Sequence, residues 1–163
     1  MKKIFYFIFA FTILGCSSDD DQLQTFRSIY SNTFWSADGG IITFSNDKLF
    51  SVIDDDDCYY WKEGSYDNVD YDGCTYDNVT YSVIEETIDK LVLIEVTSDG
   101  VENGSGSNCD GEDVTFSFEV LSDNIIRITI SDDDGTDTIS LVKENSSFSL
   151  NGCLDGALNG HLL

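Results

Sequence analysis

The sequence predicts an all-β domain, an antiparallel meander of eight to ten strands that forms a barrel or packs as a β-sandwich. Apolar and polar residues alternate through much of the chain, most regularly over residues 114–120. Such alternation places every second side chain on a buried face and the others in water. Short turns rich in Asp, Asn and Gly separate these runs. No stretch after residue 30 has the 3.6-residue period of a helix.

The chain begins with a segment typical of exported proteins. Two lysines precede an apolar run from Ile4 to Leu14. This run is too short to cross a bilayer as a helix, which takes roughly 20 residues. The sequence Ile13-Leu14-Gly15-Cys16 that ends it resembles the cleavage box of bacterial lipoproteins. The resemblance implies removal of the signal peptide, residues 1–15, and a diacylglyceryl thioether on Cys16 that anchors the protein in a lipid bilayer.

Residues 16–24 are expected to form an acidic tether between the lipid and the domain. Ser17, directly after the lipidated cysteine, is compatible with transport to the outer membrane. The run Ser18-Asp19-Asp20-Asp21 resembles the acidic signals that send some Gram-negative lipoproteins to the cell surface. We therefore expect a protein of the outer membrane that faces the cell surface. A periplasm-facing position, with a tether that is only solvated, is the alternative.

The mature chain would be strongly acidic. The full sequence has a formal net charge of −23, and removal of residues 1–15 takes two lysines away, leaving six basic residues against 31 acidic ones, or −25. Such a surface repels nucleic acid and anionic lipid and attracts cations and basic proteins. The charge therefore argues against nucleic acid as a partner.

Residues 25–163 are expected to form one β-domain. At its start Phe26 and Ile29 lie three residues apart, which suits one or two turns of helix over the end of the sheet, with irregular chain as the alternative. The main strands expected after the helix are residues 33–37, 40–45, 48–53, 89–97, 114–120, 126–130 and 138–142.

Alternation also predicts which faces are buried. In the strand 89–97, Val92, Ile94 and Val96 would form the buried face. Near the end of the meander, Ile139 and Leu141 would point inward.

A five-residue repeat occupies residues 66–85, with a tyrosine at the start of each unit. Asp72-Gly73 in its middle suggests that the repeat folds back as a hairpin.

The four cysteines other than Cys16 are expected to form two disulfides, because an even number in an exported chain is typical of such bonds. If residues 66–71 form their own strand, Cys58 and Cys74 lie at the same end of the domain. The pairs are then Cys58–Cys74 and Cys109–Cys153. If residues 64–78 are one loop, the pairs become Cys74–Cys109 and Cys58–Cys153. We favour the first arrangement. Cys153 would in either case hold the C-terminal tail against the domain.

The acidic turn at residues 132–137 is a candidate Ca²⁺ site, with Asp132, Asp134 and Asp137 as ligands. Calcium requires six to eight oxygens that converge from a loop. The turn lacks the spacing and the closing glutamate of a helix-loop-helix calcium loop. A solvated hairpin turn is the alternative interpretation.

Aromatic residues suggest a surface that binds a glycan or a protein. The candidates for ligand binding are Tyr59, Trp61, Tyr66, Tyr71 and Tyr76. Aromatic faces stack on sugar rings while carboxylates accept hydrogen bonds from hydroxyl groups. Packing in the core or between strands is the alternative.

No catalytic constellation is visible. The single histidine, His161, lies three residues from the end of the sequence, and with 31 acidic residues no carboxylate pair can be singled out. We therefore expect a protein that is not an enzyme.

The arrangement of Phe34-Trp35, the Asp38-Gly39 turn and the strand Ile42-Thr43-Phe44 resembles the lipocalin-like domains of bacterial lipoproteins. The resemblance implies a barrel with a small apolar cavity and no catalysis. Two functions compete: a surface-tethered binding or adhesion module for a glycan or protein, assisted by calcium or not, and a carrier of a small apolar ligand. The interior decides between them, since a carrier requires an open apolar lumen.

Overall fold

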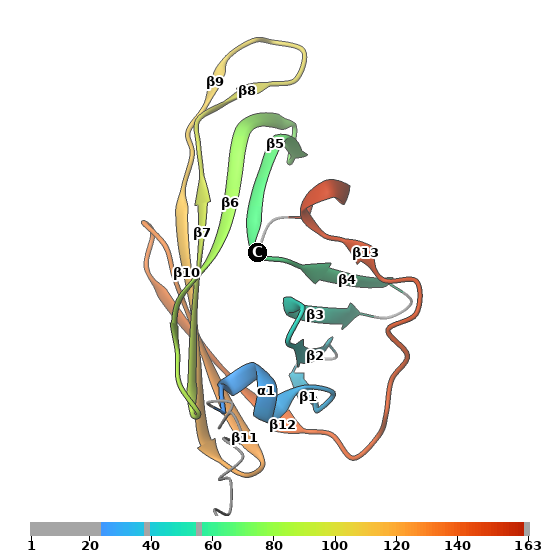
Figure 1. Ribbon diagram of the computed structural model, residues 1–163. Coiled ribbons are helices and arrows are strands. Elements are labelled where there is room, and N and C mark those ends of the chain that lie inside the picture. Colours follow the sequence, from blue (N-terminus) through green and yellow to red (C-terminus); the bar gives the residue numbers. More distant parts are fainter. Residues whose placement is uncertain (1–23, 38–39, 55–56, 162–163) are drawn as a thin grey trace, which may run out of the picture.

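A computed structural model describes residues 24–37, 40–54 and 57–161. They form one short α-helix, thirteen strands and a short 3₁₀-helix. All strands belong to one sheet, in which every pairing is antiparallel except that of β13 with β4. Figure 1 shows that this sheet curls into two layers, with β1 to β4 on one side and the long strands on the other. The prediction of an all-β antiparallel domain is confirmed.

The elements have the following bounds. The first layer holds β1 (Phe34–Ala37), β2 (Gly40–Ser45), β3 (Lys48–Asp54) and β4 (Asp57–Trp61). The second layer holds β5 (Gly64–Tyr71), β6 (Cys74–Glu86), β7 (Lys90–Thr97), β10 (Asp113–Ser122), β11 (Ile125–Ser131) and β12 (Thr136–Lys143). The remaining elements are α1 (Phe26–Tyr30), β8 (Gly100–Glu102), β9 (Asn108–Cys109), β13 (Leu154–Asp155) and the 3₁₀-helix η1 (Ala157–Asn159).

The main strands follow one another as a meander that begins at β1 and ends at β12. Because β1 pairs with β12, the two ends of the meander meet. The one interruption lies between β4 and β5. These strands are consecutive in the chain, but β4 pairs with β3 and β13 and β5 pairs with β6. Within the described residues the sheet is therefore not closed, and an open seam separates β4 from β5.

The C-terminal segment, residues 153–161, lies across this seam. Its strand β13 adds to the edge of β4, with Leu154 opposite Tyr59, and η1 contacts β5. The indole Nε1 of Trp61 donates a hydrogen bond of 3.1 Å to the carbonyl of His161. Gly156 packs so closely on this indole that a Cβ atom would fall 2.5 Å from a ring carbon, which explains why glycine occupies the position. The segment thus fills the space that a strand pairing would otherwise close.

The core lies between the two layers, on the inward faces of the strands. We call the space between these faces the lumen. Its fully buried side chains include Trp35, Phe44, Leu49, Leu91, Leu93, Phe118, Ile126 and Leu141.

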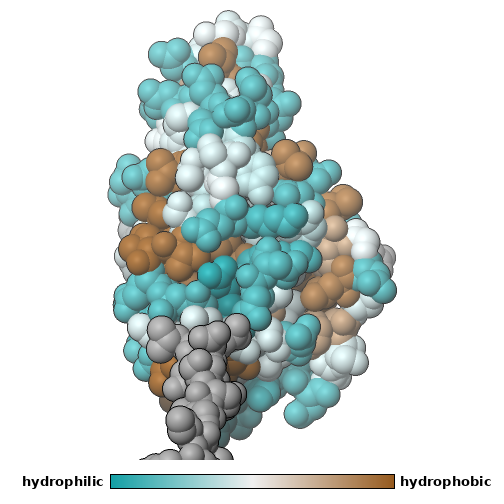
Figure 2. Space-filling view, viewed as in Figure 1, coloured by the Kyte–Doolittle hydropathy of each residue, from teal (hydrophilic) through white to brown (hydrophobic). Residues whose placement is uncertain are grey.

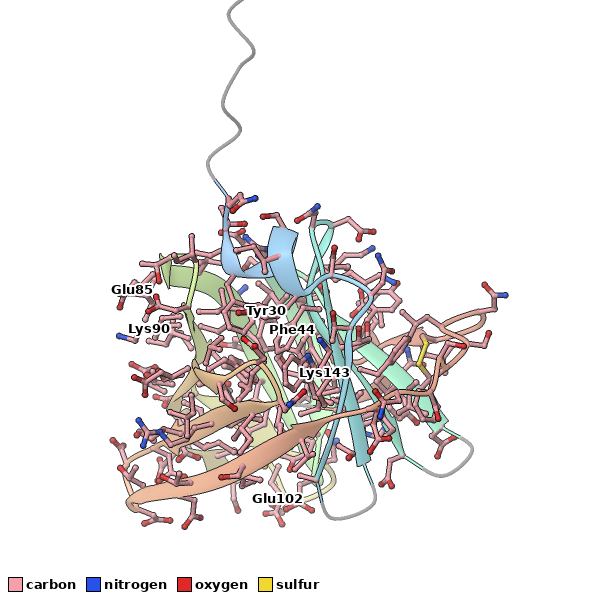
Figure 3. The ribbon with its side chains drawn as sticks, turned by 90° about the horizontal axis from the view of Figure 1, so that it is seen from below. Tyr30, Phe44, Glu85, Lys90, Glu102 and Lys143 are labelled. Carbon is pink, nitrogen blue, oxygen red and sulfur yellow. A yellow bond between two sulfur atoms is a disulfide. The ribbon has the colours of Figure 1, made fainter. Side chains whose placement is uncertain are left out.

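Helix α1 covers one end of the lumen, which we call the α1 end. Thr25 caps the helix through a hydrogen bond to the backbone of Ser28, and Phe26 is fully buried with its ring 4.9 Å from that of Phe44. Figure 3 shows Tyr30 and Phe44 together beneath the helix. The predicted helix is therefore confirmed, although Ile29, the second apolar residue of the pattern, is 39% exposed.

An ion pair holds this helix to the sheet. The Arg27 guanidinium donates to both carboxylate oxygens of Glu86 at the end of β6, at 2.8 Å for Nη2, and the Arg27 backbone N–H donates to the same carboxylate at 2.9 Å. Burial raises the pKa of Glu86, but the hydrogen bonds from Arg27 outweigh it and the net pKa is lowered. The carboxylate is thus stabilised in its charged form.

The favoured disulfide pairing was wrong. Residues 64–71 do form their own strand, as the favoured arrangement assumed, yet the disulfides are Cys58–Cys153 and Cys74–Cys109. Cys58 and Cys74 lie at the same end of the domain but on opposite sides of the open seam. The pairing of β13 with β4 brings Cys153 beside Cys58. The pairing of β8 with both β6 and β9 brings Cys109 beside Cys74.

The prediction of which face of β7 is buried was also wrong. Leu91, Leu93, Glu95 and Thr97 point into the lumen, and Val96 is 38% exposed. Both faces of this strand are apolar over residues 91–94, so alternation alone does not distinguish them. The inward face contains a glutamate because the lumen becomes polar toward one end.

Prediction for the helix clamp. Replacing Glu86 with Gln is expected to lower the free energy of unfolding at neutral pH by about 1–3 kcal/mol, because it removes a charged acceptor from a partly buried pair. A carboxyl group with a lowered folded-state pKa stabilises the protein above its unfolded pKa, and the effect is lost as pH falls through the folded value. The difference from the parent protein should therefore vanish in acid. Urea unfolding at several pH values measures it.

Glu85→Gln is the matched control, since the Glu85–Lys90 pair is more exposed, with 45% and 39% of the two side chains accessible. Its effect should stay within about 0–1 kcal/mol. Equal losses of unfolding free energy for both variants would contradict this role of the Arg27–Glu86 pair.

Candidate functional site

An apolar hollow lies in the lumen between the two layers. Its volume is about 210 Å³, and its walls are almost entirely apolar. The lining residues are Ile42, Phe50, Val52, Trp61, Phe116, Phe118, Ile128, Ile130 and Ile139. A second hollow of about 210 Å³ shares Ile42, Val52, Ile128 and Ile139 with the first and extends to Ala37, Gly40 and Leu141. The two hollows therefore adjoin.

Strand lengths explain why this space is not filled. Strand β1 has four residues, and it pairs with β12 only at Trp35 and Ser36, opposite Lys143 and Val142. The other half of β12 continues beyond β1 and keeps its pairing with β11. The inward side chains of β11 and β12 in this half, such as Ile130 and Ile139, thus face a part of the first layer where the β1–β2 hairpin ends.

A polar pocket of about 130 Å³ lies farther along the lumen, where β5, β6, β7 and β10 meet. It is lined by Tyr71, Tyr76, Glu95, Thr97, Asp110, Glu112 and Val114. Glu95 is only 2% exposed, and its Oε1 accepts a hydrogen bond of 3.1 Å from the Thr97 hydroxyl. Burial, the charge of Glu95 and hydrogen bonding to that carboxylate together raise the pKa of the fully buried Tyr81. A buried carboxylate is thus built into the wall of the lumen.

The structure separates the five aromatic residues proposed as a binding surface. Tyr71 and Tyr76 share the polar pocket, whereas Trp61 lines the apolar hollow. Tyr59 lies beneath the C-terminal segment, with its ring 4.0 Å from that of His161. Tyr66 donates a hydrogen bond of 3.4 Å to Asp155 of the same segment. These residues therefore do not form one surface.

The acidic turn between β11 and β12 has a structural role. An oxygen of Asp132 accepts hydrogen bonds from the backbone N–H groups of Asp134 and Gly135, at 2.9 and 2.8 Å. Asp134 and Asp137 are exposed. In the described ranges no group of three or more His, Cys, Asp and Glu side chains is arranged to hold a metal ion. The turn matches the alternative interpretation of a solvated hairpin turn.

Two further predictions bear on location. Cys16, the signal peptide and nearly all of the tether lie outside the described residues. Among the helices that the structure does describe, none has the length and apolar character needed to cross a membrane.

Comparison with protein-family models, curated proteins and solved structures yields no match.

Sequence reasoning missed Glu95, the most deeply buried charged residue of the site. Its signal is present but weak. In Leu91-Val92-Leu93-Ile94-Glu95 the residues on both faces are apolar until the glutamate, which a two-residue period assigns to the face of Leu91 and Leu93.

Prediction for alkaline stability. Burial, together with the charge of Asp155 and the hydrogen bond to it, raises the pKa of Tyr66 to about 12 from a reference of 10.0. Between these two values the unfolded chain loses this proton while the folded protein keeps it, so stability falls as pH rises through the window. Tyr66→Phe should make this fall less steep and remove one titrating group near the upper value. Urea unfolding across the window and ultraviolet titration measure both effects, and an unchanged slope would contradict the assignment.

Proposed function

We propose that this chain is a lipid-anchored protein of the cell envelope whose β-domain carries a small apolar ligand in its lumen. The observation that supports the carrier over an adhesion module is the pair of adjoining apolar hollows, walled by isoleucine, valine and aromatic side chains from both layers. Each buried methylene of a ligand would contribute about 0.8 kcal/mol in such a space. At about 210 Å³ each, the two hollows are smaller than the roughly 300–1,000 Å³ usual for ligand pockets, which favours a small molecule.

The fold is consistent with a lipocalin-like barrel in which one strand pairing is replaced. The meander returns to its first strand through β1 and β12, and the C-terminal segment occupies the seam between β4 and β5. On this interpretation the Cys58–Cys153 disulfide has the role of a missing strand pairing, because it fixes the segment that covers the seam.

Anchoring rests on the sequence alone. The box that ends in Cys16 supports lipidation, and the acidic run after it supports export to the outer membrane and the cell surface. Lasting attachment requires two or more acyl chains, because one chain gives only marginal binding.

The polar pocket supports a second candidate, the binding of a hydroxyl-rich ligand such as a glycan. Tyr71 and Tyr76 offer aromatic surfaces there, and Glu95 and Glu112 offer hydrogen-bond acceptors. With a volume of about 130 Å³ the pocket would take no more than a small group.

Prediction for ligand binding. The mature chain, residues 16–163 with Cys16→Ser, should bind the neutral apolar probe N-phenyl-1-naphthylamine saturably and with a rise in its fluorescence. Ile139→Trp should weaken this binding at least about tenfold, because Ile139 lines both hollows and the larger indole ring would occupy them. Circular dichroism should show an unchanged fold.

Ile88→Trp is the control, since Ile88 is 58% exposed in the turn between β6 and β7. It should bind the probe like the parent protein. Failure of the parent protein to bind the probe would contradict the proposed carrier function.

Prediction for anchoring. In a Gram-negative host the full chain should fractionate with membranes, and the mass of the intact protein should correspond to loss of residues 1–15 and addition of lipid to Cys16. Cys16→Ser should release the domain from the membrane fraction while both disulfides form. An intact mass that retains the leader with an unmodified Cys16 thiol would contradict the proposal.

A further inference from the structure

Carboxylates end five of the rows of side chains that line the hollow or the polar pocket. Along a strand, residues two apart share a face. On β11 the inward row of Ile128 and Ile130 continues to Asp132 beyond the strand, and on β12 the row of Leu141 and Ile139 continues to Asp137. Ile130 lines both the apolar hollow and the shallow acidic depression formed by this turn. The hollow and the acidic turn are therefore neighbours.

The first layer repeats this pattern. On β3 the row of Phe50 and Val52 ends at Asp54, and on β4 the row of Trp61 and Tyr59 ends at Asp57. The register between the two strands is regular, with Asp54 opposite Asp57. On β10, Phe116 and Val114 lead in the same way to Glu112 of the polar pocket.

All these carboxylates lie at the end of the lumen opposite α1, which we call the distal end. Strand β1 runs antiparallel to β12, so that the end of β1 at Ala37 lies toward the half of β12 that begins at Thr136. The antiparallel pairings of β2 and β3 then bring Asp54 to the same end. These five inward rows, on β3, β4, β10, β11 and β12, thus change from apolar to acidic in one direction along the lumen.

Basic residues show the opposite distribution. The structure describes six of them: Arg27, Lys48, Lys62, Lys90, Arg127 and Lys143. They lie in α1 or on the parts of the strands toward the α1 end, and in Figure 3 Lys90 lies on the same side as α1 while Glu102 lies on the opposite side. Among the described residues no ion pair involves Asp54, Asp57 or Asp137. Figure 2 shows hydrophilic residues over much of the visible surface.

We propose that the lumen takes a small amphiphile with a positive charge, its apolar body in the hollow and its cationic group among the carboxylates of the distal end. This inference rests on the proposed carrier function and names the class of ligand. A field from several unpaired carboxylates favours a cation and disfavours an anion at the same position. A bare metal ion fits less well, because no three acidic groups in the described chain converge on one point.

The test compares three ligands with the same eight-carbon chain: octylammonium, octanol and octanoate. Their binding to the mature chain with Cys16→Ser is measured by isothermal titration calorimetry at low salt. Octylammonium is expected to bind with one saturable site and about tenfold more tightly than octanol, as several weak surface charge pairs together would produce, with octanoate weakest. Added salt should reduce the preference.

Two double variants locate the effect. Asp54→Asn with Asp137→Asn should remove most of the preference for octylammonium and leave octanol binding unchanged. Asp123→Asn with Glu63→Gln removes the same two charges from exposed positions away from the distal end and should leave the preference intact. Ile139→Trp should weaken binding of both ligands.

Equal affinity for octylammonium and octanol would overturn the inference and leave the carrier function standing. An equal loss in both double variants would overturn it as well, because the whole charge of the protein would then attract the cation. Octylammonium binding that survives Ile139→Trp, matched by a lysine-rich peptide without apolar residues, would indicate a basic protein partner instead. Failure of all three ligands to bind would overturn the carrier function itself.

Discussion

The lumen of this protein is enclosed because residues 153–161 bridge the edges of β4 and β5. Without this segment the edge of β4 would present unpaired backbone groups, and Trp61 would lose its hydrogen bond to the carbonyl of His161. The segment is short and rich in small polar residues, so its own packing is weak, and Ala157 is its most deeply buried hydrophobic residue. The Cys58–Cys153 bond therefore carries much of the attachment. It joins residues 95 positions apart, and in the chain-entropy model a loop of this length gives about 4–5 kcal/mol of stability.

The two-residue period of a strand gives the lumen its second property, a change from apolar to polar along its length. Leu91 and Leu93 are followed on the same face of β7 by Glu95, and Phe116 and Val114 are followed on β10 by Glu112. A buried carboxylate is costly unless neighbours donate to it. Thr97 donates a hydrogen bond to Glu95, and Tyr81 is placed against it, so tyrosines that would be ordinary core residues become part of a polar wall.

Sequence reasoning reached the strands and most of their turns because alternation and turn chemistry are local. It also predicted the short helix at Phe26 for the same reason, and it predicted correctly that the side chain of Leu141 points inward. It did not reach the disulfides, since Cys58 and Cys74 are separated by a seam that depends on which strands do not pair. It assigned the wrong face to β7 because Val92 and Leu93 are both strongly apolar. The inward face is the one that carries Glu95, which lies opposite Tyr81 of β6. The aromatic candidates do not share one surface, because Tyr59 and Tyr66 contact the C-terminal segment.

The placement of charge also bears on how the domain would sit at a membrane. The described chain begins at Gln24, directly before α1, so the proposed tether would join the domain at the α1 end. Arg27, Lys48 and Lys143 lie toward this end, while Asp54 and Asp137 lie at the distal end. A bilayer surface with anionic lipid attracts the former and repels the latter. If Cys16 carries lipid as proposed, the anchor and the charge of the domain would favour the same orientation, in which the acidic end of the lumen faces away from the membrane. Because the Debye length is about 8 Å at physiological salt, this charge effect acts only when the domain is close to the surface, and the length of the tether decides how often it is.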